Sequence, residues 1–277
     1  MRAATLARMG LGAAEISQLT GFAEELADLS AQAILPHFRQ ATVVHNKLGG
    51  RGFDPVTAAD HEAEEIIRSR IKLRFPSHGF LGEESGHERG TSDLTWVVDP
   101  IDGTRAFVCG IAQWGTLIAL NEEGKPVIGV MNQPYLRERW IASNGQTRFQ
   151  HANGETQNLK TRVCGSLAEA VVSTTSPVGY FDEREQAQFW GVADQARLSR
   201  FGGDCYAYGL LAMGFIDVII ESTLKPWDIQ ALIPIIENAG GVVTTWDGAA
   251  AQEGGQVVAC GDRKLHAAVL EALANVR

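Results

Sequence analysis

The first part of the chain has hydrophobic positions at helical spacing. Over residues 15–38, apolar side chains recur every three or four positions, which predicts an amphipathic helix with Pro36 near its end. The same spacing returns over residues 60–75, and Pro76 predicts the end of this second helix. The glycine-rich segment 47–55 between the two helices is typical of a loop.

After the second helix, the pattern changes to short apolar runs that are typical of strands. Expected strands, the last three of them consecutive and antiparallel, cover residues 79–85, 94–100, 114–121, 126–134 and 137–145. Asn153 and Gly154 then predict a hairpin turn.

From about residue 160 onward, strand and helix patterns alternate. The expected strands are residues 168–177 and 217–222, and the expected helices are residues 183–196, 206–214, 226–241 and 263–276. Such alternation is typical of an α/β layer, whereas the first part combines helices with an antiparallel sheet. We therefore predict an α+β fold with an N-terminal α+β domain (residues 1–160) and a C-terminal α/β domain (residues 161–277).

The composition is globular and excludes several classes of protein. The 277 residues are 45% hydrophobic and 21% charged, which is enough for a full core. A net charge of −9, without a cluster of Lys and Arg, excludes a nucleic-acid groove. No apolar run reaches membrane-spanning length, and the start lacks the core of a signal peptide, so we expect a cytoplasmic protein without a membrane partner. The four cysteines form no CxxC pair, which predicts reduced thiols.

Acidic residues end several of the apolar runs. They are Asp54, Glu83, Glu84, Asp99, Asp102 and Asp228. Carboxylates at the ends of buried strands repel one another and are costly to desolvate, and Mg²⁺, which prefers oxygen ligands, removes that cost. Taken singly, each acid also fits an ordinary role as a helix cap, a turn residue or a solvated charge.

The segment WVVDPIDGT (residues 96–104) combines two of these acids with a helix start. A proline fixes the backbone after Asp99, so that Asp99 and Asp102 can converge on neighbouring cations. Gly103 and Thr104 would then open a helix whose free N–H groups can hold a phosphate.

Together, the acidic segments match the motifs of a known family. The matching segments are, in order, FDPVTAAD (53–60), GEES (82–85), WVVDPIDGT (96–104) and KPWDIQALIPIIENAGG (225–241). On these motifs the chain resembles the inositol monophosphatase superfamily of Mg²⁺-dependent, lithium-sensitive phosphomonoesterases, from about Glu15 to the C-terminus. The resemblance implies a layered α-β-α-β-α sandwich, two to three Mg²⁺ ions between the two domains, and a homodimer.

The resemblance also implies the metal ligands. Glu83, Asp99 and the Ile101 carbonyl would bind one Mg²⁺, and Asp99, Asp102 and Asp228 would bind a second. A third, weaker ion would lie near Glu83 and the glycine-rich loop.

For the reaction itself, the resemblance implies that Thr104, paired with Asp54, orients the attacking water. The backbone of Gly103 and Thr104 would hold the phosphoryl group. Thr57 belongs to the same motif as Asp54 and would have an accessory role, and we expect Asp60 to cap its helix.

Local sequence features indicate one branch of the family. DGTRAF (102–107) and GGDCYAY (202–208) are similar to the histidinol-phosphate phosphatase branch. Asp204 falls where inositol-specific members place a small residue that touches the sugar, and Glu221 matches the family's acidic substrate contact. Two carboxylates suit a substrate with an amine and an imidazole better than a neutral polyol. The resemblance thus implies hydrolysis of L-histidinol phosphate in histidine biosynthesis.

Several alternatives remain open at the level of sequence. Asp204 also fits a cap of the following helix. Arg105 fits a dimer contact, a brace of the site or a surface salt bridge, and Glu84 is a further accessory residue. Other substrates would be inositol 1-phosphate, a sugar phosphate or a nucleotide 3′-phosphate. A regulatory binding module without catalysis would tolerate loss of the acids, which are all intact here.

Overall fold

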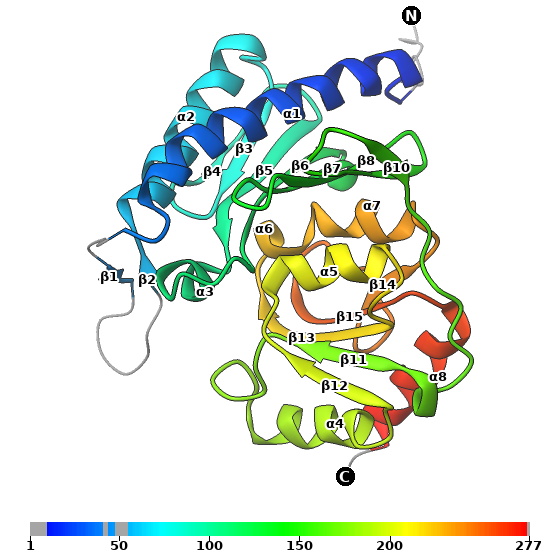
Figure 1. The fold of residues 1–277 in the computed structure, drawn as a ribbon. Coiled ribbons are helices and arrows are strands. Elements are labelled where there is room, and N and C mark those ends of the chain that lie inside the picture. The colour runs from blue at the N-terminus through cyan, green and yellow to red at the C-terminus, as the bar shows by residue number, and fades with distance from the viewer. Residues whose placement is uncertain (1–9, 41–43, 48–54, 276–277) are drawn as a thin grey trace, which may run out of the picture.

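The computed structural model describes residues 10–40, 44–47 and 55–275, which form five stacked layers (Figure 1). From one side to the other these are a helix pair, an eight-stranded sheet, a middle layer of helices, a five-stranded sheet and a second helix pair. The predicted α+β class and the α-β-α-β-α order are both confirmed.

The first outer layer consists of α1 (Ala13–Ile34) and α2 (Ala58–Arg74), which pack against each other and against the larger sheet. The apolar face of α1 is buried, as its helical spacing predicts. The α-helix stops at Ile34 instead of continuing to residue 38, and a 3₁₀ turn (Leu35–His37) follows. Pro36 explains the early end, because it lacks the N–H that the helix needs and restricts the residue before it.

The larger sheet is mixed and has the strand order β10-β9-β8-β7-β6-β5-β3-β4, in which only β3 and β5 pair in parallel. Its strands are β3 (Gly79–Gly82), β4 (Gly86–Glu88), β5 (Leu94–Asp102), β6 (Gly115–Glu122), β7 (Lys125–Gln133), β8 (Glu138–Ser143), β9 (Gln146–Gln150) and β10 (Thr156–Asn158). The predicted hairpin is confirmed, because the Gly154 N–H donates to the His151 carbonyl between β9 and β10 at 2.8 Å.

The smaller sheet has the order β12-β11-β13-β15-β14, with parallel pairs on both sides of β11. Its strands are β11 (Val171–Thr174), β12 (Leu198–Phe201), β13 (Val218–Leu224), β14 (Val242–Thr245) and β15 (Gly255–Cys260). The sequence analysis missed β4, β12, β14 and β15, and it also missed the two-stranded pair of β1 (His45–Asn46) and β2 (Pro55–Val56).

The remaining helices are α3 (Thr104–Val108), α4 (Glu183–Ala193), α5 (Asp204–Ala212), α6 (Pro226–Ile229), α7 (Leu232–Glu237) and α8 (Arg263–Ala274), with a 3₁₀ turn at Leu167–Glu169. The single helix expected over residues 226–241 is wrong, because α6 and α7 are separate. Pro234 accounts for the break, since a proline cannot donate the hydrogen bond to residue 230 that a continuous helix requires.

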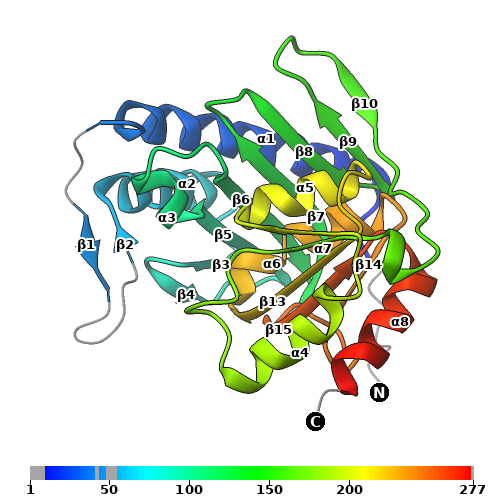
Figure 2. The same ribbon diagram turned by 60° about the horizontal axis from the view of Figure 1, so that its bottom comes forward.

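The middle layer joins the two sheets. One apolar cluster contains Val97 and Trp140 of the larger sheet, Leu211 and Ile235 of the middle helices and Ile219 of the smaller sheet. Figure 2 shows α6 beside the strands β5 and β6. In the sequence, the larger sheet comes before residue 160 and the smaller sheet comes after it. The two predicted domains, divided at residue 160, therefore share one apolar core.

Candidate metal and phosphate site

A pocket of about 380 Å³ opens beside the C-terminal ends of β5 and β13. The sequence-predicted residues in its lining are Glu83, Asp99, Ile101, Asp102, Gly103, Thr104, Arg105, Asp204, Glu221 and Asp228. Glu84 and Thr57 do not line the pocket, and Asp54 lies outside the described residues. The fold thus gathers acids from both sheets and from the middle layer at one place.

A β-bulge in β5 delivers two of these acids. Asp99 pairs with Leu117 of β6, and Asp102 pairs with Gly115, so β5 has one residue more than β6 between the two pairs. A bulge bends its strand and re-aims the neighbouring side chains. Both acids therefore reach the pocket from one strand end.

Hydroxyl groups bind the two carbonyls of the bulge. The Thr116 hydroxyl donates to the Pro100 carbonyl at 2.8 Å, and the Thr104 hydroxyl donates to the Ile101 carbonyl at 3.0 Å. Thr104 begins α3 directly after Gly103, whose φ of +86° is a conformation that favours glycine. The Ile101 carbonyl and the Thr104 hydroxyl, both predicted site groups, are thereby held against each other.

Three carboxylates form the centre of the site. Asp99, Asp102 and Asp228 each place one oxygen within 4.8 Å of those of the other two. Burial raises the pKa of Asp99 well above its usual range, and the charges of Glu83, Asp102 and Asp228 raise it further. Burial likewise raises the pKa of Asp102 well above its usual range and that of Asp228 to about 7. Such a cluster has more negative charge than its protein surroundings balance.

Backbone donors orient two of the three carboxylates. The Cys205 N–H in α5 donates to Asp102 at 2.6 Å, and the Lys225 N–H donates to Asp228 at 2.7 Å. Asp228 lies in the short helix α6, which begins with a proline after Lys225. Both contacts lower the pKa of the acceptor, but burial outweighs them.

Contacts between the larger sheet and the α6–α7 segment fix the place of Asp228. The Asn121 side chain in β6 donates to the Gln230 side-chain oxygen at 2.6 Å, and both residues are buried. On the neighbouring strand β7, Gly129 lies so close to the segment that an added Cβ would be 2.1 Å from the Ala231 carbonyl oxygen. The segment that carries Asp228 therefore docks directly on the sheet that carries Asp99.

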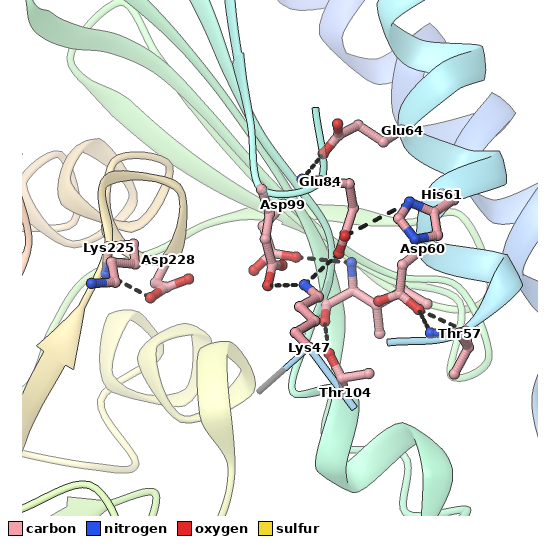
Figure 3. Close-up of polar contacts among 12 residues, drawn as sticks. Lys47, Thr57, Asp60, His61, Glu64, Glu84, Asp99, Thr104, Lys225 and Asp228 are labelled. Atoms are coloured by element: carbon pink, nitrogen blue, oxygen red, sulfur yellow. Dashed lines mark hydrogen bonds and ion pairs between the residues drawn. The ribbon is translucent and has the colours of Figure 1, made fainter. Parts of the chain in front are cut away.

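Glu83 and Glu84 share an ammonium group. The Lys47 Nζ lies 2.7 Å from Glu83 Oε1 and 2.6 Å from Glu84 Oε1 (Figure 3). Glu83 also adjoins Asp99, since its charge raises the Asp99 pKa. Glu84 does not line the pocket, and its other carboxyl oxygen lies 3.7 Å from His61 Nδ1 of α2 (Figure 3).

Thr57 and Asp60 form a capping box at the start of α2. The Thr57 N–H and hydroxyl donate to Asp60 Oδ2 at 2.9 and 2.6 Å, and the Ala59 N–H donates to the Thr57 hydroxyl at 3.2 Å. The expected cap by Asp60 is confirmed. The Thr57 hydroxyl is bound within this cap.

Asp204 and Glu221 lie in the wall of the pocket. Helix α5 begins at Asp204, and Gly203 is its N-cap, so the alternative of Asp204 as the cap is wrong. Burial raises the pKa of Asp204 to about 6, while the Arg105 charge lowers it. Burial raises the pKa of Glu221 to about 8, although Thr175 donates to it from its N–H at 2.7 Å and its hydroxyl at 3.0 Å.

Arg105 faces the pocket. Its guanidinium carbon lies 4.5 Å from the ring centre of Tyr180, and its charge acts on Asp204. A cation over an aromatic ring is attracted by the ring electrons. The contact with Tyr180 and the charge acting on Asp204 match a brace of the pocket, one of the roles that the sequence left open for Arg105.

The sequence and the fold are both similar to those of known proteins. The pattern of the inositol monophosphatase family matches residues 15–277. The chain belongs to the inositol monophosphatase family. Bifunctional phosphatase IMPL2, chloroplastic, of Arabidopsis thaliana is 42% identical over 270 residues, which cover 94% of this chain and 76% of the relative. Histidinol-phosphatase of Mycobacterium tuberculosis is 37% identical over 206 residues, 74% of this chain and 79% of the relative.

Solved structures support the same family. An inositol monophosphatase from Zymomonas mobilis matches with a TM-score of 0.82 and 38% identity, covering 96% of this chain and 100% of that one. As an inositol monophosphatase family member, the chain is a phosphomonoesterase, and its substrate is a phosphate monoester. Within the described residues, no helix combines the length and apolar character needed to cross a membrane.

The site fits the metal on which the inositol monophosphatase family depends. Asp99, Asp102 and Asp228 offer hard oxygen donors, and their raised pKa values show that the protein alone does not neutralise them. A divalent cation would hold all three carboxylates in the ionised form.

Sequence reasoning missed several residues of this family site. Four residues that contact predicted site residues were not themselves predicted: Lys47, Glu64, Thr175 and Tyr180. Glu64 carried a usable signal, because a glutamate on the apolar face of a helix needs a polar partner. Lys47 and Tyr180 stand in stretches without a periodic pattern, and their partners are far away in the chain.

Proposed function

We propose that this chain hydrolyses L-histidinol phosphate to L-histidinol and phosphate, as a Mg²⁺-dependent step of histidine biosynthesis. The observation that carries the proposal is the pair of carboxyl groups, half-buried Asp204 and buried Glu221, in the wall of the pocket that also holds the candidate metal-binding acids. Similarity to histidinol-phosphatase of Mycobacterium tuberculosis, at 37% identity, supports it.

In this proposal, the acids of the bulge and of α6 hold two to three Mg²⁺ ions. The ligands would be Glu83, Asp99, the Ile101 carbonyl, Asp102 and Asp228. Bound Mg²⁺ supplies charge neutralisation of the phosphate and lowers the pKa of water. Glu84 would act as an accessory residue by sharing Lys47 with Glu83.

The chain's own groups orient the reaction. The Thr104 hydroxyl, which in this structure donates to the Ile101 carbonyl, would accept the proton of the attacking water and pass its own to Asp54. The backbone N–H groups of Gly103 and Thr104 would hold the phosphoryl oxygens in place. Arg105 would keep the wall beside Asp204 rigid through its stacking on Tyr180.

A cationic substrate suits the wall of the pocket. An ammonium or imidazolium group beside Asp204 or Glu221 favours the ionised carboxylate and forms a charge-assisted hydrogen bond with it. A neutral polyol cannot compensate the two carboxylates in this way. The 38% identity to an inositol monophosphatase makes inositol 1-phosphate the second candidate substrate.

A substrate panel tests the proposal. We expect kcat/KM for L-histidinol phosphate to exceed that for inositol 1-phosphate and for adenosine 3′,5′-bisphosphate, with phosphate release lost after chelation of Mg²⁺. Equal or higher kcat/KM on either competitor would exclude histidinol phosphate as the preferred substrate. Absence of turnover on every ester, with Mg²⁺ bound, would favour a regulatory binding module.

We also infer a cytoplasmic homodimer from the family resemblance. Light scattering coupled to gel filtration measures the assembly directly. A mass of one chain, 29.9 kDa, would exclude the dimer.

A further inference from the structure

Glu64 of α2 reaches the turn that presents Glu83. Its two carboxyl oxygens accept hydrogen bonds from the backbone N–H of Glu84 at 2.8 Å and of Ser85 at 2.7 Å. The side chain is only 2% exposed, and Figure 3 shows it extending from α2 toward residue 84. The turn between β3 and β4 is thus bound to a helix of the outer layer.

The carboxyl group of Glu64 also fits closely against Gly82. A Cβ at Gly82 would lie 2.5–2.6 Å from the carboxyl carbon and both oxygens of Glu64. The glycine therefore leaves the space that this carboxyl group occupies. The contact involves the end of a side chain, so an added methyl group would displace the carboxyl group and leave the backbone in place.

The same turn is tied to β5 on its other side. The Glu83 N–H donates to the Val98 carbonyl at 3.3 Å, one residue before Asp99. Successive N–H groups at residues 83, 84 and 85 are thus bound by β5 and by Glu64. On this backbone the Glu83 side chain lies near Asp99, whose pKa its charge raises.

We propose that Glu64 is a positioning residue for metal binding: through the N–H groups of residues 84 and 85, it sets the turn that aims Glu83 at the metal site. A contact that served only to attach α2 could be made by an apolar side chain, without burying a carboxyl group beside Glu83 and Glu84. The inference rests on the proposed role of Glu83 as a metal ligand.

The test is Mg²⁺ binding measured by titration calorimetry without substrate. Glu64→Gln keeps the size of the side chain, but its amide group places a donor against one of the two N–H groups. Gly82→Ala displaces the carboxyl group from the other side. Each variant is expected to weaken Mg²⁺ binding by roughly 10-fold or more, as changes to groups that orient metal ligands do.

A matched control and a double variant separate positioning from general damage. Glu65→Gln changes the neighbouring glutamate of α2, which is exposed and pairs with Arg68, and should leave Mg²⁺ binding unchanged. The double variant Glu64→Gln with Gly82→Ala should bind about as weakly as either single variant, because both disturb one contact.

Wild-type Mg²⁺ affinity in folded Glu64→Gln and Gly82→Ala would overturn the inference while leaving the proposed function intact. If Glu64→Gln does not fold, Gly82→Ala alone decides in the same way. A wild-type protein that binds no Mg²⁺ would instead refute the proposed metal chemistry and this inference with it. A lower melting temperature with unchanged Mg²⁺ affinity also counts against a positioning role.

Discussion

The two sides of the pocket are built in different ways. The N-terminal side takes Asp99, Asp102 and Thr104 from one short segment, in which a bulge and a helix start follow each other, and adds Glu83 from the turn after β3. The C-terminal side takes Asp204, Glu221 and Asp228 from three separate elements, α5, β13 and α6. In the proposed function, the contiguous side carries the phosphate chemistry, whereas the dispersed side carries the substrate contacts on separate elements.

Asp228 is the exception to this division. It belongs to the dispersed side, yet its carboxylate completes the cluster with Asp99 and Asp102. The docking of α6 and α7 on the larger sheet makes this possible. We therefore expect three kinds of effect. Substitutions on the contiguous side should reduce turnover, and substitutions on the dispersed side should change substrate preference. Substitutions where the two sides join should do both.

Asp99→Asn should have the largest effect on activity. The amide removes a charge that the metal site needs, so we expect kcat to fall by at least about 10³-fold. The metal-free variant should be at least as stable as the wild type, because a buried like charge is gone. Phosphate release and thermal unfolding measure the two effects, with exposed Asp194→Asn as the control. Substantial activity in Asp99→Asn would remove Asp99 from the site.

Gly129→Ala tests the joint between the two sides. The new Cβ would lie 2.1 Å from the Ala231 carbonyl oxygen and 2.8 Å from Pro234 Cγ, so backbone must move. We expect a loss of about 1–3 kcal/mol in the free energy of unfolding and weaker Mg²⁺ binding, since α6 carries Asp228.

The control for that joint is Gly21→Ala in α1, where an added Cβ would meet no atom within 4 Å. It should be neutral or stabilising by about 0.5–1 kcal/mol. Denaturant unfolding and calorimetry provide both numbers. Unchanged Mg²⁺ affinity in a destabilised Gly129→Ala would show that the joint does not place Asp228.

Asp204→Asn should separate substrate choice from chemistry. Loss of a charge-assisted hydrogen bond should raise KM for L-histidinol phosphate by about 10-fold. Hydrolysis of p-nitrophenyl phosphate, which has no cationic group, should change by less than about 3-fold on the same reasoning. An equal loss on both substrates would place Asp204 with the phosphate chemistry instead.

Stability against pH should show the smallest effect. Burial raises the pKa of Asp204 to about 6, of Asp228 to about 7 and of Glu221 to about 8, from ordinary values of 3.8, 3.8 and 4.5. Between pH 4 and 8 the folded protein therefore binds protons that the unfolded chain has lost, so its stability falls as pH rises. In a chelator, we expect Tm to drop by roughly 5 °C between pH 5 and 8.

Mg²⁺ should reverse that trend. Metal binding needs ionised carboxylates, so at saturating Mg²⁺ the melting temperature should no longer fall over this range. Calorimetric scans with chelator and with Mg²⁺ make the comparison. A chelated protein whose Tm rises from pH 5 to 8 would contradict the burial of these acids.

The sequence predicted the contiguous side of the site better than the dispersed side. The local structure of residues 96–104 can be predicted from the sequence, because the apolar run, the proline and the Gly-Thr pair are neighbours in the chain. The break between α6 and α7 depends on Pro234, a local signal that was present and overlooked. The strand β12, in contrast, carries exposed Leu198 and Phe201 and has no clear alternation.

Contacts between distant segments could not be predicted in this way. The family resemblance brings the glycine-rich loop near Glu83, but it does not indicate that the Lys47 side chain would lie between Glu83 and Glu84. Asn121 and Gln230 are 109 positions apart, and only the completed fold brings their amide groups together. Local motifs identify the acids, but contacts between distant segments of the chain hold them in place.

The bulge in β5 also determines how far apart Asp99 and Asp102 can lie in the sequence. In a regular strand, residues three apart point to opposite faces of the sheet, so Asp99 and Asp102 would be separated by the sheet itself. The extra residue restores their common side. The spacing of three positions and the bulge therefore depend on each other, because a regular strand with the same spacing would turn one of the two carboxylates away from the site.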